Sequence, residues 1–232
     1  MGLIREFVKA RLSDGSRRAV RALVDELRLQ RIHRRSLRDV HRYLGHGELK
    51  LHLGCGANYK PGWVNIDISL VKIPVGPRHP DLWLDLREDL PFPDGSASVI
   101  YSEHFFEHLD YPREVKHLLR EAMRVLEPGG LFSVGVPDTA YALESYVYGN
   151  EEFFRVTRER KFHPAWCRTW MHQINYHFWQ DGEHKWQYDF ETLAQVLADA
   201  GFVDVAQRPF DPSLDSEYRR WGTLYADARK PG

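Results

Sequence analysis

Residues 102–108, Ser-Glu-His-Phe-Phe-Glu-His, concentrate side chains that can transfer protons or bind metals. His104 and His108 lie four positions apart, with Glu107 between them. Because histidine titrates near neutral pH, either ring could act as a general base toward a substrate hydroxyl. We predict His108 as the first candidate for this role and His104 as the second. The alternative interpretation is that His108 packs at the start of a helix and orients the adjoining loop.

The same residues match H-x-x-E-H, an inverted zinc-protease motif in which two histidines bind one metal. The context opposes a protease, because the motif directly follows a predicted strand of a parallel sheet. The histidines farther along the chain, His163, His172, His177 and His184, show no tight ligand spacing. The sequence therefore predicts no metal site.

Three further positions follow predicted strands, at the edge where α/β sheets bind their ligands. The turn Gly54-Cys55-Gly56 lets the backbone approach a ligand closely, because glycine has no Cβ. Asp67 ends the next strand, where a carboxylate can accept hydrogen bonds from both hydroxyls of a ribose. Asp85 and Leu86 follow the third strand and suit an adenine amine and its flat face. These strand ends together indicate a nucleoside-containing ligand.

The elements that position these residues are predicted strands and helices in alternation. The predicted strands are 50–53, 63–66, 82–84, 97–101, 131–136, 202–206 and 223–228. Amphipathic helices are predicted over 112–126 and 190–200, the second capped by Asp189. This alternation favours a mainly parallel sheet with helices on both faces, and the closing pair of strands favours an antiparallel edge. Only thirteen positions separate Gly54 from Asp67, so the usual first helix is shortened to a turn.

Five segments together resemble the class I S-adenosylmethionine (SAM)-dependent methyltransferases. They are residues 51–56, Asp67, residues 90–96, Glu107-His108-Leu109 and residues 126–130. The resemblance covers residues 50–138 and is nearest to a small bacterial group of the methyltransferase type 11 kind, often linked to polysaccharide and cell-envelope glycan assembly. It implies a Rossmann-like, seven-stranded, mainly parallel sheet whose last strand is antiparallel.

The resemblance implies SAM as the cofactor and S-adenosylhomocysteine as its product. The cofactor contacts that it implies are Gly54, Cys55, Gly56, Asp67, Asp85, Leu86 and, after the fourth strand, Ser102. NAD is disfavoured, because the third glycine of G-x-G-x-x-G falls on Tyr59 and the acid comes earlier than the spacing of about 20 residues in dinucleotide sites. In related O-methyltransferases a histidine near His108 removes the acceptor's proton.

Residues 139–188 are rich in aromatic side chains and show no clean period. They follow the fifth strand, where related enzymes insert substrate-binding elements. We predict acceptor contacts at Tyr141, His184 and Trp186, in a saccharide or aromatic pocket with a lid. A plain hydrophobic subdomain or a homodimer contact is the equally weighted alternative.

Residues 1–47 form a basic segment ahead of a predicted catalytic domain at 48–232. The segment carries twelve Lys and Arg against five Asp and Glu, with Val20, Leu23, Val24 and Leu27 at helical spacing and Ser16 as an expected cap. Helices packed on the domain with a solvated charged face are the favoured interpretation. A peripheral contact with an anionic membrane is the second. Nucleic acid is the least favoured, because the remaining chain is acidic.

Composition adds few constraints on the 232 residues, whose net charge is −1. The two cysteines, Cys55 and Cys167, form no C-x-x-C pair, which fits a reducing compartment. No apolar run approaches the roughly 18 residues of a membrane span. We therefore expect a cytoplasmic protein without a nucleic-acid partner.

The sequence as a whole predicts a SAM-dependent methyltransferase that methylates an oxygen of a saccharide or glycan intermediate. One alternative is methylation of another small acceptor, such as a phenol or amine natural product. A second alternative is a SAM-binding protein without turnover that serves as a scaffold or partner subunit.

Overall fold

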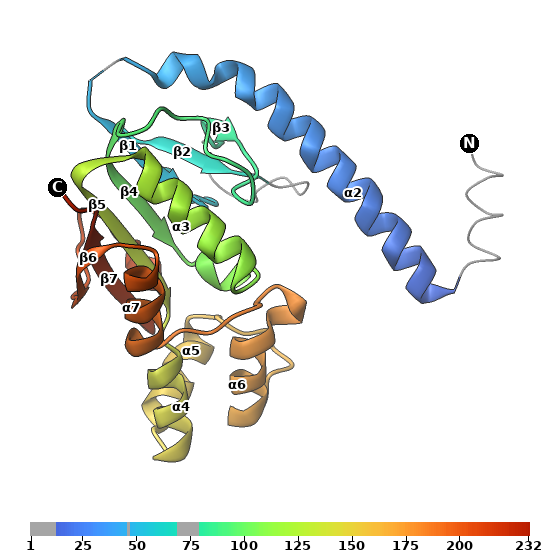
Figure 1. The fold of residues 1–232 in the computed structure, drawn as a ribbon. Coiled ribbons are helices and arrows are strands. Elements are labelled where there is room, and N and C mark those ends of the chain that lie inside the picture. Colours follow the sequence, from blue (N-terminus) through green and yellow to red (C-terminus); the bar gives the residue numbers. More distant parts are fainter. Residues whose placement is uncertain (1–12, 46, 69–78) are drawn as a thin grey trace.

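A computed structural model describes residues 13–45, 47–68 and 79–232, which fold around one seven-stranded sheet (Figure 1). The strands are β1 (Leu49–Leu53), β2 (Val64–Asp67), β3 (Leu82–Trp83), β4 (Ala97–Glu103), β5 (Leu126–Pro137), β6 (Val203–Arg208) and β7 (Thr223–Arg229). Their order is β3-β2-β1-β4-β5-β7-β6, with β1 to β5 parallel and β7 antiparallel to both its neighbours. The predicted Rossmann-like sheet with an antiparallel last strand is confirmed.

Helices and short 3-10 turns connect these strands. They are α2 (Asp14–Ser36), η1 (Leu37–Tyr43), η2 (Phe106–His108), α3 (Arg113–Val125), α4 (Thr139–Val147), α5 (Glu151–Glu159), α6 (Trp170–Trp179), η3 (Gln180–Gly182), α7 (Phe190–Asp199) and η4 (Glu217–Arg219). The predicted cap of α7 is present, because Asp189 Oδ1 accepts a hydrogen bond from the Thr192 amide at 2.8 Å. Among the described residues, no helix combines the length and apolarity needed to cross a membrane.

The main core lies between the sheet and the helices α3 and α7, which cover its near face in Figure 1. The apolar side of α3 is fully buried against this sheet, as its helical spacing predicts. Side chains alternate along each strand, so Ile100 enters this core while Tyr101 points to the opposite face. On that opposite face the Tyr101 hydroxyl donates to Asp215 Oδ1 at 3.0 Å, in the segment between β6 and β7. A polar network therefore replaces a helix at this position.

The connection from β1 to β2 is a turn, as the short spacing predicts. Gly54 has a φ of +66°, and a Cβ there would lie 2.4 Å from the ring of Phe105. The Asn65 side chain closes the turn, because its Oδ1 accepts from the Lys60 amide at 2.8 Å and its Nδ2 donates to the Lys60 carbonyl at 2.9 Å. Glycine is therefore required at position 54 by both its conformation and its neighbour.

The C-terminal part of the basic helix α2 contacts the edge of the sheet at β3 (Figure 1). Ser36 Oγ accepts from the Trp83 amide at 2.8 Å, and His33 Nδ1 accepts from the Asp85 amide at 3.1 Å. The preceding turns of the helix are mostly exposed. The expected cap was wrong by three residues, because Ser13 accepts from the Ser16 amide and α2 starts at Asp14.

The aromatic stretch folds into α4, α5 and α6, which gather beyond one end of the sheet (Figure 1). They share a small core of Ala142, Phe153, Phe154 and Ile174. Phe154 also stacks on Trp170 with ring centroids 4.5 Å apart. The hydrophobic-subdomain interpretation therefore describes part of this stretch.

Candidate active site

His104 follows β4 in a left-handed conformation, with a φ of +53°. Its amide donates to the Gly135 carbonyl at 2.8 Å, its Nε2 lies 2.8 Å from Thr223 Oγ1, and its Nδ1 lies 3.6 Å from Glu107 Oε1. Burial lowers the pKa of His104 well below its ordinary value. Both ring nitrogens therefore face fixed partners.

Glu107 is a buried carboxylate, only 1% exposed. Its Oε1 lies 3.9 Å from His108 Nε2, while its Oε2 has no hydrogen-bond partner among the described residues. Burial raises the pKa of Glu107 to about 7. Its backbone carbonyl accepts from the Lys185 amide at 2.7 Å, which holds the end of the aromatic stretch against η2.

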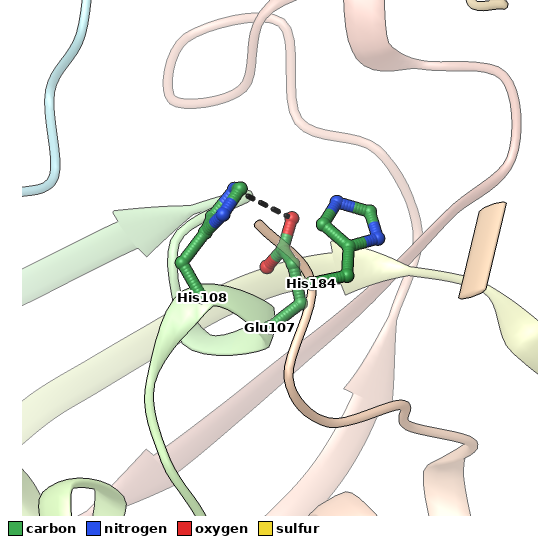
Figure 2. Close-up of side chains that lie close together, drawn as sticks. All are labelled: Glu107, His108 and His184. Atoms are coloured by element: carbon green, nitrogen blue, oxygen red, sulfur yellow. Dashed lines mark ion pairs between the residues drawn. The ribbon is translucent and has the colours of Figure 1, made fainter. Parts of the chain in front are cut away.

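His108 and His184 face each other from η2 and from the loop before α7, with ring centroids 5.0 Å apart (Figure 2). His108 Nδ1 donates to the Glu183 carbonyl at 3.1 Å, and His184 Nδ1 donates to the His177 carbonyl at 2.6 Å. A carbonyl can only accept, so each Nδ1 carries the proton and each Nε2 keeps a lone pair. Burial lowers the pKa of His108 to about 4 and also lowers that of His184.

A cavity of about 250 Å³ lies between these residues and the helices α5 and α6. Its walls combine histidines, aromatic rings and two basic side chains, and they include His104, His108, His177, His184, Tyr176, Trp221, Lys161 and Arg219. His104, His108 and His184 thus line the same cavity, and their role toward an acceptor stays a prediction.

Two of the predicted acceptor contacts do not line this cavity. The Trp186 ring stacks on Tyr111 with centroids 4.5 Å apart. The Tyr141 ring packs against Phe153 and Trp221 at 5.1 and 5.8 Å, both of which do line the cavity. Tyr141 therefore supports the cavity wall from behind, whereas the Trp186 ring packs on a residue that does not line the cavity.

The turn after β1 and the acid after β2 are joined by hydrogen bonds. Asp67 Oδ2 accepts from the Gly56 amide, and its Oδ1 accepts from the Ile68 amide, both at 2.6 Å. Burial raises the pKa of Asp67, an effect that these two amides oppose. Cys55 is buried, and its backbone amide donates to the Ile66 carbonyl at 3.1 Å while its carbonyl accepts from the Asn58 amide at 2.8 Å, so a cofactor contact at Cys55 stays a prediction. Asp67 is held rigidly at the strand end that suits a ribose.

Ser102 provides a test of whether a polar ligand fits this edge. It pairs in register with Leu53 on β1, and its buried Oγ has no hydrogen-bond partner among the described residues. An unpaired buried hydroxyl is costly unless a ligand or water satisfies it. The orphaned hydroxyl, the fixed carboxylate of Asp67 and the Gly54 turn fit a nucleoside with a polar tail, and SAM has this form.

The residues predicted to bind the adenine, Asp85 and Leu86, lie beside α2. Both Asp85 carboxylate oxygens accept from the Arg87 guanidinium, at 2.9 and 2.6 Å, and Arg87 also contacts Glu26 of α2 at 2.9 Å. Leu86 is 2% exposed and belongs to the core. A hollow of about 230 Å³ lies here, between Asp85 and residues of α2 and η1. The adenine contacts at Asp85 and Leu86 stay predictions.

Sequence reasoning missed a group of buried polar residues beside the cofactor edge. Glu103 is 1% exposed; its carboxylate accepts from Asn58 Nδ2 at 3.3 Å and from the Tyr225 hydroxyl at 3.2 Å, and its Oε2 lies 3.9 Å from Arg219. Only adjacency to His104 could have drawn attention to Glu103. Arg219 and Tyr225 come from the C-terminal segment, where the sequence shows no pattern.

Comparison with protein families gives one match. The family model described as a methyltransferase domain matches residues 76–134, the segment that contains β4, His104, Glu107 and His108. The resemblance to the class I SAM-dependent methyltransferases is confirmed. This match supports SAM, the cofactor that the resemblance implies. A comparison with curated protein sequences finds no match.

Solved structures are similar to this domain at low identity. A chain of the complex between the Haloferax volcanii Trm112 methyltransferase activator and the putative methyltransferase is 20% identical, with a TM-score of 0.48, and the similarity covers 91% of this chain and 97% of that one. A SAM-dependent methyltransferase from Archaeoglobus fulgidus is 18% identical, with a TM-score of 0.49 and coverage of 89% and 94%. At this level the similarities carry no information on substrate or site residues.

Proposed function

We propose that this methyltransferase domain transfers a methyl group from SAM to a hydroxyl oxygen of a saccharide or glycan intermediate. The observation that carries the proposal is the position of the cavity. Its wall residue His104 is followed directly by Phe105, whose ring packs on Gly54 of the cofactor turn. An acceptor in the cavity would therefore lie next to the cofactor's expected methionine end.

The lining of the cavity favours a sugar over a purely apolar acceptor. Tyr176 and Trp221 offer faces for a sugar ring, while His177, Lys161 and Arg219 offer hydrogen bonds to hydroxyls or to an acidic substituent. Its volume of about 250 Å³ suits a small acceptor group, since pockets for drug-sized ligands span roughly 300–1,000 Å³.

When bound, SAM supplies a methyl group already activated by a positively charged sulfur. In this proposal the Gly54-Cys55-Gly56 backbone and Ser102 hold its amino-acid end, Asp67 its ribose, and Asp85 with Leu86 its adenine. These residues align the cofactor and exclude water, which is a large part of catalysis in such a transfer.

His108 is the residue that we propose acts on the acceptor hydroxyl. Its Nδ1 is fixed by the Glu183 carbonyl, so its Nε2 lone pair is the part able to accept the hydroxyl's hydrogen. His104 is the weaker candidate, because both its ring nitrogens face Thr223 and Glu107. His184 in the cavity wall and Tyr141, which packs behind Phe153 and Trp221, shape the acceptor's position, and a contact of Trp186 with the acceptor stays a prediction.

The test is S-adenosylhomocysteine release with two acceptor panels. One panel contains sugars, nucleotide sugars and glycan fragments, and the other contains phenols and amines. The proposal expects turnover with a member of the first panel and at least a tenfold loss of kcat/KM in His108→Ala. Turnover with phenols or amines alone would assign another acceptor class, and cofactor binding without turnover on either panel would favour a non-catalytic partner protein.

A further inference from the structure

Glu107, His108 and His184 form a cluster of one carboxylate and two imidazoles in the cavity wall (Figure 2). One ligand atom from each residue lies within 4.8 Å of the others. Seventy-six positions separate His108 from His184 in the chain, so the ligand spacing is created by the fold and not by a sequence motif.

Both histidines are oriented in the way that metal-bound histidines usually are. Each donates its Nδ1 proton to a backbone carbonyl, of Glu183 in one case and His177 in the other. Such a bond fixes the tautomer, aims the ring and leaves Nε2 as a neutral ligand. The presence of the same arrangement at both rings is the first observation in favour of a cation.

The second observation is the buried carboxyl oxygen of Glu107 that has no partner. Its Oε2 has no hydrogen-bond partner, and no Lys or Arg forms an ion pair with it among the residues that the structure describes. The charge of Arg219 opposes the rise in the pKa of Glu107, but its guanidinium donates to the backbone carbonyl of Glu103 and faces that residue's carboxylate. A buried carboxylate without a counter-charge is expensive, and a metal ion is one of the few partners that offsets the cost.

We propose that Glu107, His108 and His184 bind one first-row divalent cation, with Zn²⁺ as the best-matched ion. Two imidazoles and one carboxylate are the ligand set of many catalytic zinc sites, which leave a position open for water or substrate. Imidazole ligands select against Mg²⁺, which prefers oxygen. Binding would draw the three ligand atoms to roughly 3.3 Å apart, as metal–ligand bonds of 2.0–2.2 Å require.

This inference rests on the proposed function and specifies how His108 acts there. The open position faces the cavity, because all three ligands line it. An acceptor hydroxyl bound at that position would be polarised by the cation and would release its proton to solvent, so its oxygen would be ready to accept the methyl group. His108 would then be a ligand of the cation and not a free base.

The test is Zn²⁺ titration of the full chain after removal of metals with a chelator, read out by competition with a chromophoric chelator. We expect one Zn²⁺ to bind per chain, with an affinity at least tenfold higher than that for Mg²⁺. Affinity should fall at least tenfold in His184→Ala and in the nearly isosteric Glu107→Gln. His163→Ala is the matched control, because His163 lines the same cavity outside the cluster, and it should bind as the wild type does.

A second readout separates loss of the site from misfolding. Zn²⁺ should raise the melting temperature of the wild type and of His163→Ala, and leave that of Glu107→Gln unchanged. Equal Zn²⁺ affinity in the wild type and His184→Ala, or an equal loss in His163→Ala, would overturn the proposal. S-adenosylhomocysteine titration of the same samples keeps the two proposals apart, since cofactor binding without Zn²⁺ binding removes only the metal site.

Discussion

At the scale of single residues, two positions show how the fold constrains side chains around the cofactor turn. Gly54 has both a left-handed backbone and the Phe105 ring where a Cβ would be. His52, two residues earlier on β1, is 1% exposed and its Nδ1 bonds to Asn65 Oδ1 at 3.1 Å. Asn65 in turn closes the β1–β2 connection. Each residue therefore links local backbone geometry to the shape of the ligand edge.

Gly54→Ala should lower the free energy of unfolding by at least ~2 kcal/mol. The new Cβ would strain the left-handed backbone and would also clash with the packed Phe105 ring. Gly62→Ala is the control: Gly62 also has a positive φ, of +82°, but no atom of the described residues lies within 4 Å of an added Cβ. For Gly62→Ala we expect the free energy of unfolding to fall by only ~1 kcal/mol. Urea unfolding measures both, and equal losses would show that Phe105 does not define the turn.

His52 should make stability depend on acid pH. Burial, and secondarily the nearby charge of Lys60, lowers the pKa of His52 to about 3 in the folded protein, below the ordinary value near 6.5. The unfolded chain therefore binds a proton that the folded chain does not, between pH 6.5 and 3. Its contribution to stability is complete above pH 6.5 and falls by at most about 1.4 kcal/mol per pH unit below it.

The measurement is the free energy of unfolding from urea titrations between pH 7 and 4. His52→Gln should have a shallower slope than the wild type, whereas the exposed His41→Gln should keep the full slope. Parallel curves for the wild type and His52→Gln would mean that His52 does not carry this dependence.

At the scale of elements, the sequence predicted the regular parts and missed those that depend on distant contacts. The helices α3 and α7 followed from apolar spacing and caps, and the strands from their alternation with turns. The stretch that became α4 to α6 showed no period, because its apolar residues serve a small core, a cavity and partly exposed surfaces at once. The pairing of His184 with Glu107 and His108 depends on a backbone bond between Lys185 and Glu107, which no local pattern encodes.

The helix α2 presents an exposed apolar stripe of Val20, Leu23, Val24 and Leu27, with Leu23 61% and Leu27 49% exposed. Arg17, Arg21 and Arg28 flank the stripe. An amphipathic basic helix of this kind is suited to the surface of an anionic membrane. We therefore expect the protein to bind vesicles that contain phosphatidylglycerol, and this peripheral contact stays a prediction of the basic segment.

Vesicle sedimentation tests this expectation. The double variant Leu23→Glu and Leu27→Glu should bind at least fivefold more weakly, since it replaces apolar area by negative charge. Leu143→Glu, at an exposed position on α4, is the control and should bind as the wild type does. Binding that is unaffected by the double variant would place any membrane contact elsewhere.

At the scale of the whole molecule, the residues predicted to bind ligands fall into two regions at the carboxyl ends of the strands. The predicted cofactor residues lie at the carboxyl ends of three neighbouring strands: Gly54 follows β1, Asp67 ends β2 and Ser102 is the next-to-last residue of β4. The acceptor cavity is built from η2, the insertion and the segment before β7 together. The first region could be predicted because each residue follows a recognisable strand. The second could not, because its walls converge from three separate parts of the chain.

The most direct test of the account is calorimetric titration of the purified chain with S-adenosylhomocysteine, beside Asp67→Ala. The Gly56 and Ile68 amides hold the carboxylate of Asp67, the residue predicted to accept the ribose hydroxyls. We predict binding in the micromolar range for the wild type and its loss, at least tenfold, in Asp67→Ala with the fold verified by circular dichroism. A folded wild-type protein that does not bind, or a variant that binds equally well, would contradict the assignment of this edge to SAM.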